Sequence, residues 1–396
     1  MTANWPLLPI GDVCKLINGR AFKPSDWSDA GTPIVRIQNL NDASKPFNYY
    51  RGEVAPKHLI QQEDILLSWS GTPGTSFGCF IWKQGAAILN QHIFRVHPDE
   101  AVLDREFFVH AVNSRLEEMI AQAHGGVGLR HITKGKLEAI RIPVPAKSEQ
   151  RRVVARIGEA MARVDEIRRL RGETLAESRG LLPSLLKAVF SAVSARHAPV
   201  SIESLAEETR YGTSEKCSTE NSGTPVLRIP NVAAGRVNFE GLKFMPSVVE
   251  ATDRLALHEG DLLVVRTNGS PTLVGRCAVV PPLTEVYAYA SYLIRVRLDI
   301  GRADPRYVSY FLASTLGRDQ IAAKRHTSAG QFNINTQDIL SMEVPLPTLP
   351  QQRELVAQMS GVEEATLTTQ SELSAARAHD ELLPSSILRK AFAGEL

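Results

Sequence analysis

Residues 31–40 read GTPIVRIQNL and residues 223–232 read GTPVLRIPNV, so the chain repeats one phrase 192 positions later. The match continues along both halves. HGGVGLRHIT at 124–133 aligns without a gap on HTSAGQFNIN at 326–335, and IPVPAKSEQRRVVARI at 142–157 aligns on VPLPTLPQQRELVAQM at 344–359, both at an offset of 202. The offset grows only through loops, where copies of one unit diverge most. The sequence therefore predicts two copies of one unit of about 195 residues.

Each copy has two parts. The first alternates short β-branched runs with Gly, Pro, Asn and Ser turns and ends in a helical stretch, at 104–124 and at 304–324, which predicts a mixed β-rich domain. The second follows a Pro-x-Pro stop and predicts a long helix, with Ser148 as its N-cap in the first copy. We expect an α+β chain whose β-rich domains and helices alternate, with boundaries at 1–147, 148–195, 196–349 and 350–396.

Both predicted helices carry a coiled-coil seam, because apolar residues recur at spacings of four and three. The first seam comprises Val153, Ile157, Ala160, Val164, Ile167, Arg171, Thr174, Ser178, Leu181 and Leu185. The second comprises Leu355, Met359, Val362, Thr366, Thr369, Leu373, Ala376, Leu383 and Ile387. We expect the two helices to pair; two separate helices, each packed on its own domain, would explain the periodicity less well. Pro183 and Pro384 should break or kink each helix near its C-terminal end.

The bulk composition is that of a globular protein. The chain has a mass of 43.5 kDa, 43% hydrophobic and 22% charged residues and a net charge of +2, which neither indicates nor excludes nucleic acid. Its four cysteines are scattered, with no C-x-x-C pair, so we expect reduced thiols and no metal site. The first residues lack a basic region followed by an apolar stretch, so we expect no signal peptide. No apolar run approaches the roughly 18 residues that would span a membrane. We expect a cytoplasmic protein that does not contact a membrane.

Motifs that carry catalysis are missing from the sequence. It contains no G-x-x-x-x-G-K-[ST], no G-x-G-x-x-G between a strand and a helix, and no G-x-S-x-G. The one Pro-Pro pair, at 281–282, lacks the flanking residues of an amino-methyltransferase motif, and HPDE at 97–100 has no lysine nearby to complete a nuclease site. A binding or scaffolding role is favoured over an enzyme, and no cofactor is expected on this chain.

Three kinds of motif carry a resemblance that covers the whole chain. They are the paired segments EDILLSWSGTPGTSFGCFIW at 63–82 and GDLLVVRTNGSPTLVGRCAVV at 260–280, the strand AILNQHIFRV at 87–96, and PLPTLPQQRELVAQM at 345–359. The duplicated unit resembles the specificity subunit of type I restriction-modification systems. The resemblance implies two target recognition domains that each read half of a split sequence in double-stranded DNA, held apart by two antiparallel helices. It also implies methyltransferase subunits that dock on these helices and use S-adenosylmethionine to methylate adenine, together with restriction (motor-nuclease) subunits.

Loops that follow apolar strands carry the side chains suited to base edges and phosphates. The candidates in the first domain are Arg20, Lys23, Arg36, Gln38, Ser68, Ser70, Thr72, Thr75, Gln91, Arg130 and His131. Those in the second are Lys216, Arg228, Asn231, Arg266, Thr267, Asn268, Ser270, Arg276, Arg325, His326 and Gln331. Positions that differ between the copies, such as Ser70, Arg130, Asn268 and Gln331, are expected to read bases, because the two halves must read different sequences. Equivalent positions, such as Arg36 and Arg228, suit phosphate contacts or a shared structural role.

Two other functions stay open. A structural adaptor would join two partner proteins through the β-rich domains and would not bind DNA even beside a methyltransferase. A metal-dependent nuclease with a dispersed site would cleave DNA as the isolated chain.

Overall fold

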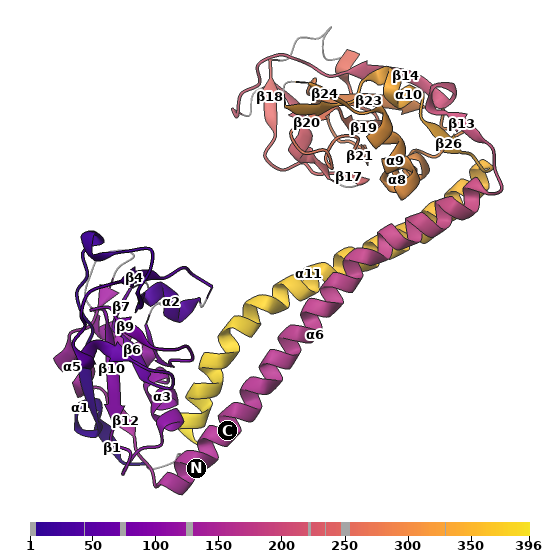
Figure 1. Ribbon diagram of the computed structural model, residues 1–396. Helices are drawn as coiled ribbons and strands as arrows, with labels where there is room; N and C mark the ends of the chain where they lie inside the picture. The colour runs from indigo at the N-terminus through magenta and orange to yellow at the C-terminus, as the bar shows by residue number, and fades with distance from the viewer. Residues whose placement is uncertain are drawn as a thin grey trace. The chain divides into compact units, whose positions relative to one another are not determined.

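The computed structural model describes residues 5–42, 44–71, 77–123, 130–220, 223–233, 235–246, 254–328 and 330–396. The chain divides into two compact units. Unit 1 comprises Met1–Arg171 together with Ala375–Leu396, and unit 2 comprises Gly172–Ser374. Both are mixed α/β structures (Figure 1).

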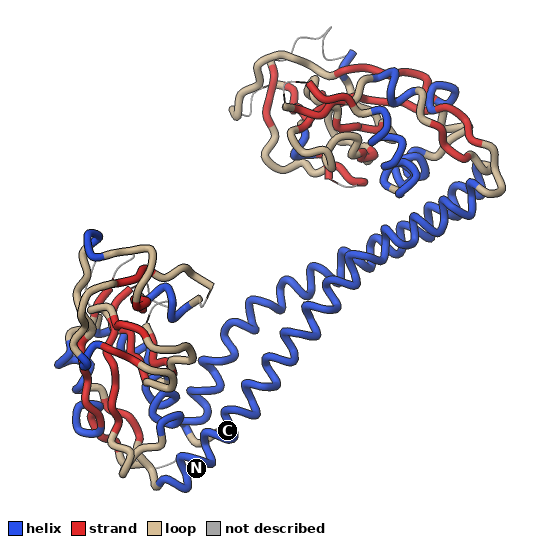
Figure 2. Tube along the Cα trace, viewed as in Figure 1, coloured by secondary structure: helices blue, strands red, loops and turns tan. Residues whose placement is uncertain are grey.

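Unit 1 contains short strands, short helices and parts of two long helices (Figure 2). Its strands are β1 (Leu7–Pro9), β2 (Cys14–Asn18), β3 (Thr32–Val35), β4 (Asn48–Tyr50), β5 (Leu59–Ile60), β6 (Ile65–Ser68), β7 (Ser70–Gly71), β8 (Gly78–Ile81), β9 (Ala87–Leu89), β10 (Ile93–Pro98), β11 (Arg130–His131) and β12 (Arg141–Pro143). Its helices are α1 (Ile10–Val13), α2 (Ile37–Asn41), α3 (Arg105–Asn113), α4 (Leu116–Gln122), α5 (Lys134–Ala139), and the 3₁₀ turns η1 (Pro24–Asp26) and η2 (Pro56–His58). The long helix α6 (Lys147–Ser194) begins in this unit.

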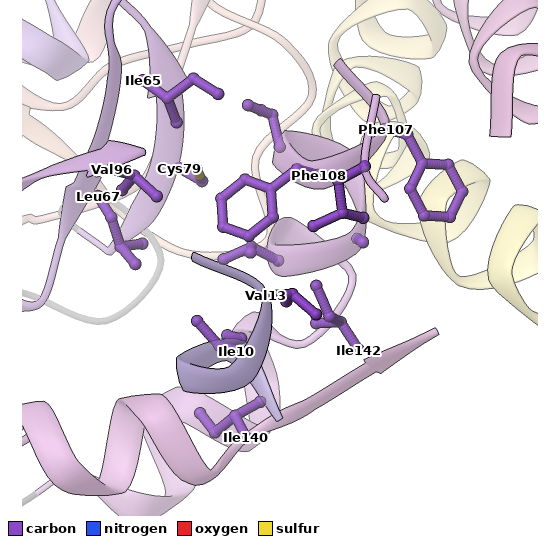
Figure 3. Packing of buried hydrophobic residues seen from close by; sticks show 14 of the residues in the cluster. Ile10, Val13, Ile65, Leu67, Cys79, Val96, Phe107, Phe108, Ile140 and Ile142 are labelled. Carbon is purple, nitrogen blue, oxygen red and sulfur yellow. The ribbon is translucent and has the colours of Figure 1, made fainter. Parts of the chain in front are cut away.

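The main sheet of unit 1 has the strand order β2-β10-β6-β8, and a second four-stranded sheet has the order β4-β3-β9-β5. Figure 3 shows the core that the first sheet forms with α1 and α3. Phe108 of α3 lies beside strand residues such as Ile65, whereas Phe107 points toward the long helix α11. The rings of Phe107 and Phe392 are 5.3 Å apart. The N-terminal part of α6 and the C-terminal part of α11 therefore share one core with the sheet.

Unit 2 is built from a similar set of elements. Its strands are β13 (Pro199–Ser201), β14 (Ala206–Tyr211), β15 (Thr224–Leu227), β16 (Val232–Ala233), β17 (Gly235–Val237), β18 (Lys243–Met245), β19 (Leu262–Val265), β20 (Thr267–Asn268), β21 (Cys277–Val279), β22 (Ala288–Tyr289), β23 (Leu293–Leu298), β24 (His326–Ser328), β25 (Gln331–Asn333) and β26 (Glu343–Pro345). Its helices are α8 (Pro305–Ala313), α9 (Thr315–Lys324), α10 (Thr336–Leu340), α11 (Leu349–Ala393), and the 3₁₀ turns η3 (Ile202–Leu205) and η4 (Ile229–Asn231).

The strand order of unit 2 repeats that of unit 1. Its main sheet contains the series β14-β23-β19-β21, where unit 1 has β2-β10-β6-β8. The pairing of the first strand is repeated too: Leu7 faces Pro143 in unit 1, and Pro199 faces Pro345 in unit 2. Leu7 and its equivalent Pro199 are 192 positions apart, and Pro143 and its equivalent Pro345 are 202 positions apart. These are the offsets that relate the two halves of the sequence. The sequence repeat is thus a repeat of strand register.

A buried glutamine fixes the start of each long helix. The Gln150 side chain accepts a hydrogen bond from the Asp104 backbone N–H at 2.7 Å and donates to the carbonyls of Val102 and Pro145. Gln352 makes the same three bonds in unit 2, accepting from Asp304 and donating to Arg302 and Pro347. Both side chains are fully buried, so each helix leaves its domain in a defined direction.

The predicted N-cap at Ser148 is wrong, because α6 begins one residue earlier, at Lys147. The Ala146 carbonyl already accepts bonds from the backbone N–H groups of Glu149 and Gln150. Because the carbonyl of the N-cap residue accepts the first hydrogen bond within a helix, these bonds place the N-cap at Ala146. The Gln150 side chain, rather than a capping hydroxyl, holds this end.

The face that α6 buries moves along the helix. Val153 and Ile157 are buried in unit 1, but Leu181 is 54% exposed and Leu182 packs on the core of unit 2 in its place. An α-helix drifts about 20° per heptad relative to a 3.5-residue repeat. Over the 28 residues from Val153 to Leu181 the drift reaches about 80°, nearly the 100° between successive residues. The heptad prediction at Leu181 is therefore wrong by one residue.

Neither proline breaks its helix. Pro183 lies inside α6, which continues to Ser194, and Pro384 lies inside α11, which continues to Ala393. The core contacts of Phe190 and Phe392 hold the segments that follow the two prolines. The predicted break is therefore wrong, because tertiary packing compensates for the missing backbone donor.

The helical stretches predicted at 104–124 and 304–324 are each two helices. In unit 2 the chain is extended at Ser314, whose hydroxyl caps α9 by accepting a hydrogen bond from the Gly317 N–H. A Cβ at Gly317 would lie 2.1 Å from the Phe311 carbonyl oxygen, so the break requires glycine there. The β-branched run at 32–40 is a strand only as far as Val35, and the short helix α2 follows.

Candidate nucleic-acid interface

Strand pairing in unit 2 joins two segments that the sequence places 60 residues apart. β20 pairs antiparallel with β25, with Thr267 facing Asn333 and Asn268 facing Phe332. The Thr267 hydroxyl donates to the Gln331 side-chain oxygen at 3.1 Å. The candidates Thr267, Asn268 and Gln331 therefore lie together on one small sheet, which β24 completes. We call residues 266–276, β24 and β25, together with Tyr211, Arg318 and Arg325, which contact them, the unit 2 reading surface, after the prediction that it reads bases.

The loop after β20 is held by its own polar groups. The Asn268 side chain accepts a hydrogen bond from the Ser270 N–H at 2.9 Å, and the hydroxyls of Ser270 and Thr272 lie 2.9 Å apart. Thr272 is exposed, and Asn268 and Ser270 are half-buried. A loop with these bonds presents amide and hydroxyl groups in fixed positions, as base recognition requires.

Aromatic rings orient two arginines of this surface. The Arg266 guanidinium lies 4.8 Å from the Tyr211 ring, and that of Arg325 lies 4.7 Å from the Phe332 ring. Stacking of this kind leaves the edge of the planar guanidinium available to acceptors. Arg276 is exposed. His326 is 64% exposed and its Nε2 lies 3.2 Å from an Asp338 carboxylate oxygen.

Unit 1 has the same kind of pairing. β7 pairs antiparallel with β11, with Ser70 facing His131. The Gln91 side chain lies 3.1 Å from His92 Nε2. Burial, and then the nearby His131, lowers the pKa of His92 below its usual value. The candidates Ser70, Gln91 and His131 therefore lie in one region of the unit. Thr72 and Thr75 lie outside the described residues, as does the side chain of Arg130.

Six further candidates lie elsewhere in the two units, outside these small sheets. Arg20 donates to the Tyr50 hydroxyl at 2.9 Å and stacks on that ring at 4.4 Å. Arg36 donates to the Asn48 side chain at 3.1 Å and lies 5.3 Å from the Trp27 ring, while Arg228 donates to the Gly241 carbonyl. Lys23, Gln38 and Lys216 are exposed.

The structure gives Asn231 a different role from the predicted one. This residue is fully buried. Its side chain accepts from the Arg228 N–H at 2.9 Å and donates to the carbonyls of Asn238 and Glu240. Asn39 makes the equivalent bonds in unit 1, accepting from the Arg36 N–H. Every polar atom of Asn231 is thus used to hold a turn, so the prediction that it contacts DNA is corrected.

Ser68 and Thr267 are also buried. Ser68 donates to the Ser70 carbonyl at 3.3 Å, and Thr267 is bonded to Gln331. Both support the loops that follow them, because they occupy the inward face at a strand end. We therefore place them beneath the reading surfaces and correct the prediction that they touch DNA directly.

Two residues of the unit 2 surface were not predicted from the sequence. Arg318 of α9 donates to the Thr272 carbonyl at 3.2 Å, and Tyr211 carries the stacked Arg266. Neither follows an apolar strand into a polar loop, which was the criterion for the candidates. Arg318 and Arg325 are seven residues apart, or about two helical turns, so they share one face of a helix. This spacing is a signal that could have indicated Arg318.

Within the described residues, no group of three or more His, Cys, Asp or Glu side chains is arranged to hold a metal ion. Among those same residues, no helix has the length and apolar character needed to cross a membrane.

A family described as type I restriction modification DNA specificity domain matches residues 3–171. The chain is 27% identical over 420 residues to the type I restriction enzyme EcoKI specificity subunit of Escherichia coli (strain K12), with 99% of this chain and 89% of that protein covered. It is 23% identical to the StySPI specificity subunit of Salmonella potsdam, with the same coverage of both proteins.

Solved structures share the fold. A chain from a structure on complex assembly and conformational transition of the type I R-M system matches with a TM-score of 0.72 at 19% identity, and both chains are covered completely. The HsdS subunit from Thermoanaerobacter tengcongensis matches with a TM-score of 0.64 at 20% identity, over 100% of this chain and 98% of that one.

The first copy thus matches the type I restriction modification DNA specificity domain, and the chain is similar along its whole length to type I specificity subunits. The resemblance indicated by the sequence motifs is confirmed. No catalytic family is indicated by these matches.

Proposed function

We propose that this chain is the non-catalytic DNA-specificity subunit of a type I restriction-modification complex. The observation that carries the proposal is the similarity to specificity subunits over 99% of the chain. The local geometry supports it, because each unit pairs a loop after a central strand with a second polar segment, β7 with β11 and β20 with β25.

In this proposal each β-rich domain reads one half of a bipartite target. The two reading surfaces share their strand pairing but differ in side chains: Ser70 and His131 face one another in unit 1, whereas Thr267 bonds to Gln331 in unit 2. Different donors and acceptors at equivalent places would read different bases. The domains 1–147 and 196–349 are thus two recognition domains of one design.

The helices α6 and α11 would pair as an antiparallel coiled coil that sets the distance between half-sites. Contacts within each unit support this pairing. In unit 1, the buried carboxylate of Asp380 on α11 is paired with the Arg171 guanidinium of α6. In unit 2, Leu186 and Phe190 of α6 share a core with Val356 and Met359 of α11. The later of these positions on α6 contacts the earlier of the positions on α11, which supports an antiparallel arrangement.

Chemistry in such a complex would belong to other chains. Methyltransferase subunits would dock on the helices and bring S-adenosylmethionine, and restriction subunits would cut unmethylated DNA. This chain would select the site where both act, in the cytoplasm.

The test is the methylome of cells that express this chain with its neighbouring methyltransferase, measured by single-molecule sequencing. We expect one split motif with modified adenine in each half. A purified complex of the two proteins that creates no new methylation would refute the specificity role and favour the structural adaptor. Metal-dependent cleavage by the isolated chain would favour the nuclease.

A further inference from the structure

Three arginines of unit 2 surround the loop Ser270–Thr272. Arg318 and Arg325 extend from α9 and its C-cap and donate to neighbouring carbonyls of this loop, at Thr272 and Pro271, with distances of 3.2 and 3.1 Å. Arg276 closes the loop, where its backbone N–H donates to the Leu273 carbonyl. The Phe332 ring fixes the orientation of Arg325 at 4.7 Å. The guanidinium groups of Arg318 and Arg325 are therefore held at a loop that is distant from them in sequence, and the charge of Arg276 acts on Arg318.

No carboxylate pairs with any of the three side chains in the described part of the chain. Other arginines of unit 2 differ in this respect, since Arg295 and Arg297 are paired with Glu208 and Asp261. Burial, followed by the charges of Arg276 and Arg325, lowers the pKa of Arg318. Gathering like charges costs free energy unless an anion neutralises them.

Most of the donors in this cluster are free. A guanidinium carries five N–H groups, and the side chains of Arg318 and Arg325 each make one hydrogen bond to the loop within the described residues. The exposed Thr272 hydroxyl lies among them. The bonds to the loop position the guanidiniums, and the remaining donors suit the three oxygens of a phosphate group.

We propose that Arg276, Arg318 and Arg325 form a phosphate clamp that holds one backbone phosphate of the DNA half-site read by unit 2. The inference rests on the proposed function and deepens it. Asn268 and Ser270 lie on the same loop, so a phosphate fixed by the clamp would set the position of the bases that these side chains read. Arg318 is a positioning residue, because it contributes charge and register without reading a base.

The test measures DNA binding by the complex of the full chain with its methyltransferase as a function of salt. The variants are Arg318→Gln, which keeps a donor for the Thr272 carbonyl, and Arg276→Gln, which changes an exposed side chain. The matched control is Arg302→Gln. Arg302 is an exposed arginine in the turn before α8, and its side chain donates to the Ser204 carbonyl. Thermal unfolding of each variant checks that it is folded.

For each clamp variant we expect the slope of log K against log salt to become shallower by about 0.9. Between 50 and 200 mM salt the loss of affinity would then be roughly 3.5-fold smaller than in the wild type. The weakening should be equal for all sequences, so the methylated motif stays the same. The control should keep the wild-type slope.

Two results overturn the clamp while leaving the proposed function intact: folded Arg276→Gln and Arg318→Gln complexes with the wild-type slope, or variants that methylate a changed motif. Calorimetric titration of the full chain with inorganic phosphate tests whether the cluster binds free phosphate instead of a phosphate of the DNA backbone. Tight phosphate binding that Arg318→Gln abolishes, together with an unchanged slope on DNA, would assign the cluster to a free phosphate instead. A wild-type complex that does not prefer its own duplex refutes the proposed function and the clamp with it.

Discussion

Replacing Asn231 with alanine separates support of the fold from recognition of DNA. The change removes three hydrogen bonds, to the Arg228 N–H and to the carbonyls of Asn238 and Glu240, at a fully buried site. Each backbone group left without a partner costs about 1–3 kcal/mol, so we expect a loss of about 3–5 kcal/mol. For a unit of this size, 1 kcal/mol lowers Tm by about 2–4 °C. The transition of unit 2 should therefore fall by roughly 10 °C.

The assay is differential scanning calorimetry of the full chain, combined with the methylome of cells grown at a permissive temperature. Asn231→Ala should lower the transition and leave the methylated motif unchanged. The matched control is Asn268→Ala, on the half-buried loop, which should change one half of the motif and cost less than about 1 kcal/mol. An Asn231→Ala chain with the wild-type transition and an altered motif would refute the assignment of Asn231 to the fold.

Three further predictions concern helix packing, thiols and pH. Leu182→Ala should destabilise unit 2 by about 2 kcal/mol and Leu181→Ala by less than about 0.5 kcal/mol, as urea unfolding would show; equal losses would contradict the displaced helix face. Burial raises the pKa of Cys277 to about 12 and also raises that of Cys79. At pH 8 a disulfide reagent should therefore modify both thiols only after the chain unfolds. Rapid modification of these thiols in the native chain would contradict this prediction. Burial lowers the pKa of His110 below 6.5, although the charges of Glu106 and Asp104 act in the opposite direction. The folded state therefore favours the neutral imidazole. Unit 1 should lose stability as the pH falls through 6.5 toward the lowered pKa. The unfolding transition of His110→Gln should show a smaller decrease between pH 7.5 and 5.5, and an unchanged pH dependence would contradict it.

The repeat and its register could be predicted from the sequence because strand pairing preserves spacing. Residues that form cross-strand partners, such as Leu7 with Pro143 and Pro199 with Pro345, must keep their separation in both copies, whereas loops are free to change length. Aligned offsets of 192 and 202 therefore indicate equivalent strands from the sequence alone.

The side-chain roles were harder to predict, because a polar residue after a strand can face either the loop or solvent. Asn231 and Asn268 both follow apolar strands, yet one is fully buried and the other lies on the reading loop. The spacing of Arg318 and Arg325 can indicate that they share a face of α9, but it does not indicate which loop lies beside that face. Such contacts between distant segments depend on tertiary packing, which local patterns do not contain.

The drift of the α6 face has a similar origin. A heptad repeat predicts a seam only if the helix winds at 3.5 residues per turn. Toward the end of α6, Leu186 is buried beside the half-buried heptad position Leu185, and Leu181 is exposed, as expected for a helix with 3.6 residues per turn. Helix geometry, rather than composition, decided which leucine is buried.

The most direct test of the central claim is a domain exchange. Residues 196–349 would be replaced by the equivalent segment of a related specificity subunit with a different target, and the methylome of cells expressing the hybrid chain with the methyltransferase would be determined. If each recognition domain reads one half-site, the hybrid should methylate a motif in which one half is new while the other half and the gap between them are those of the original chain. Methylation with both halves changed, or with the original motif intact, would contradict the account.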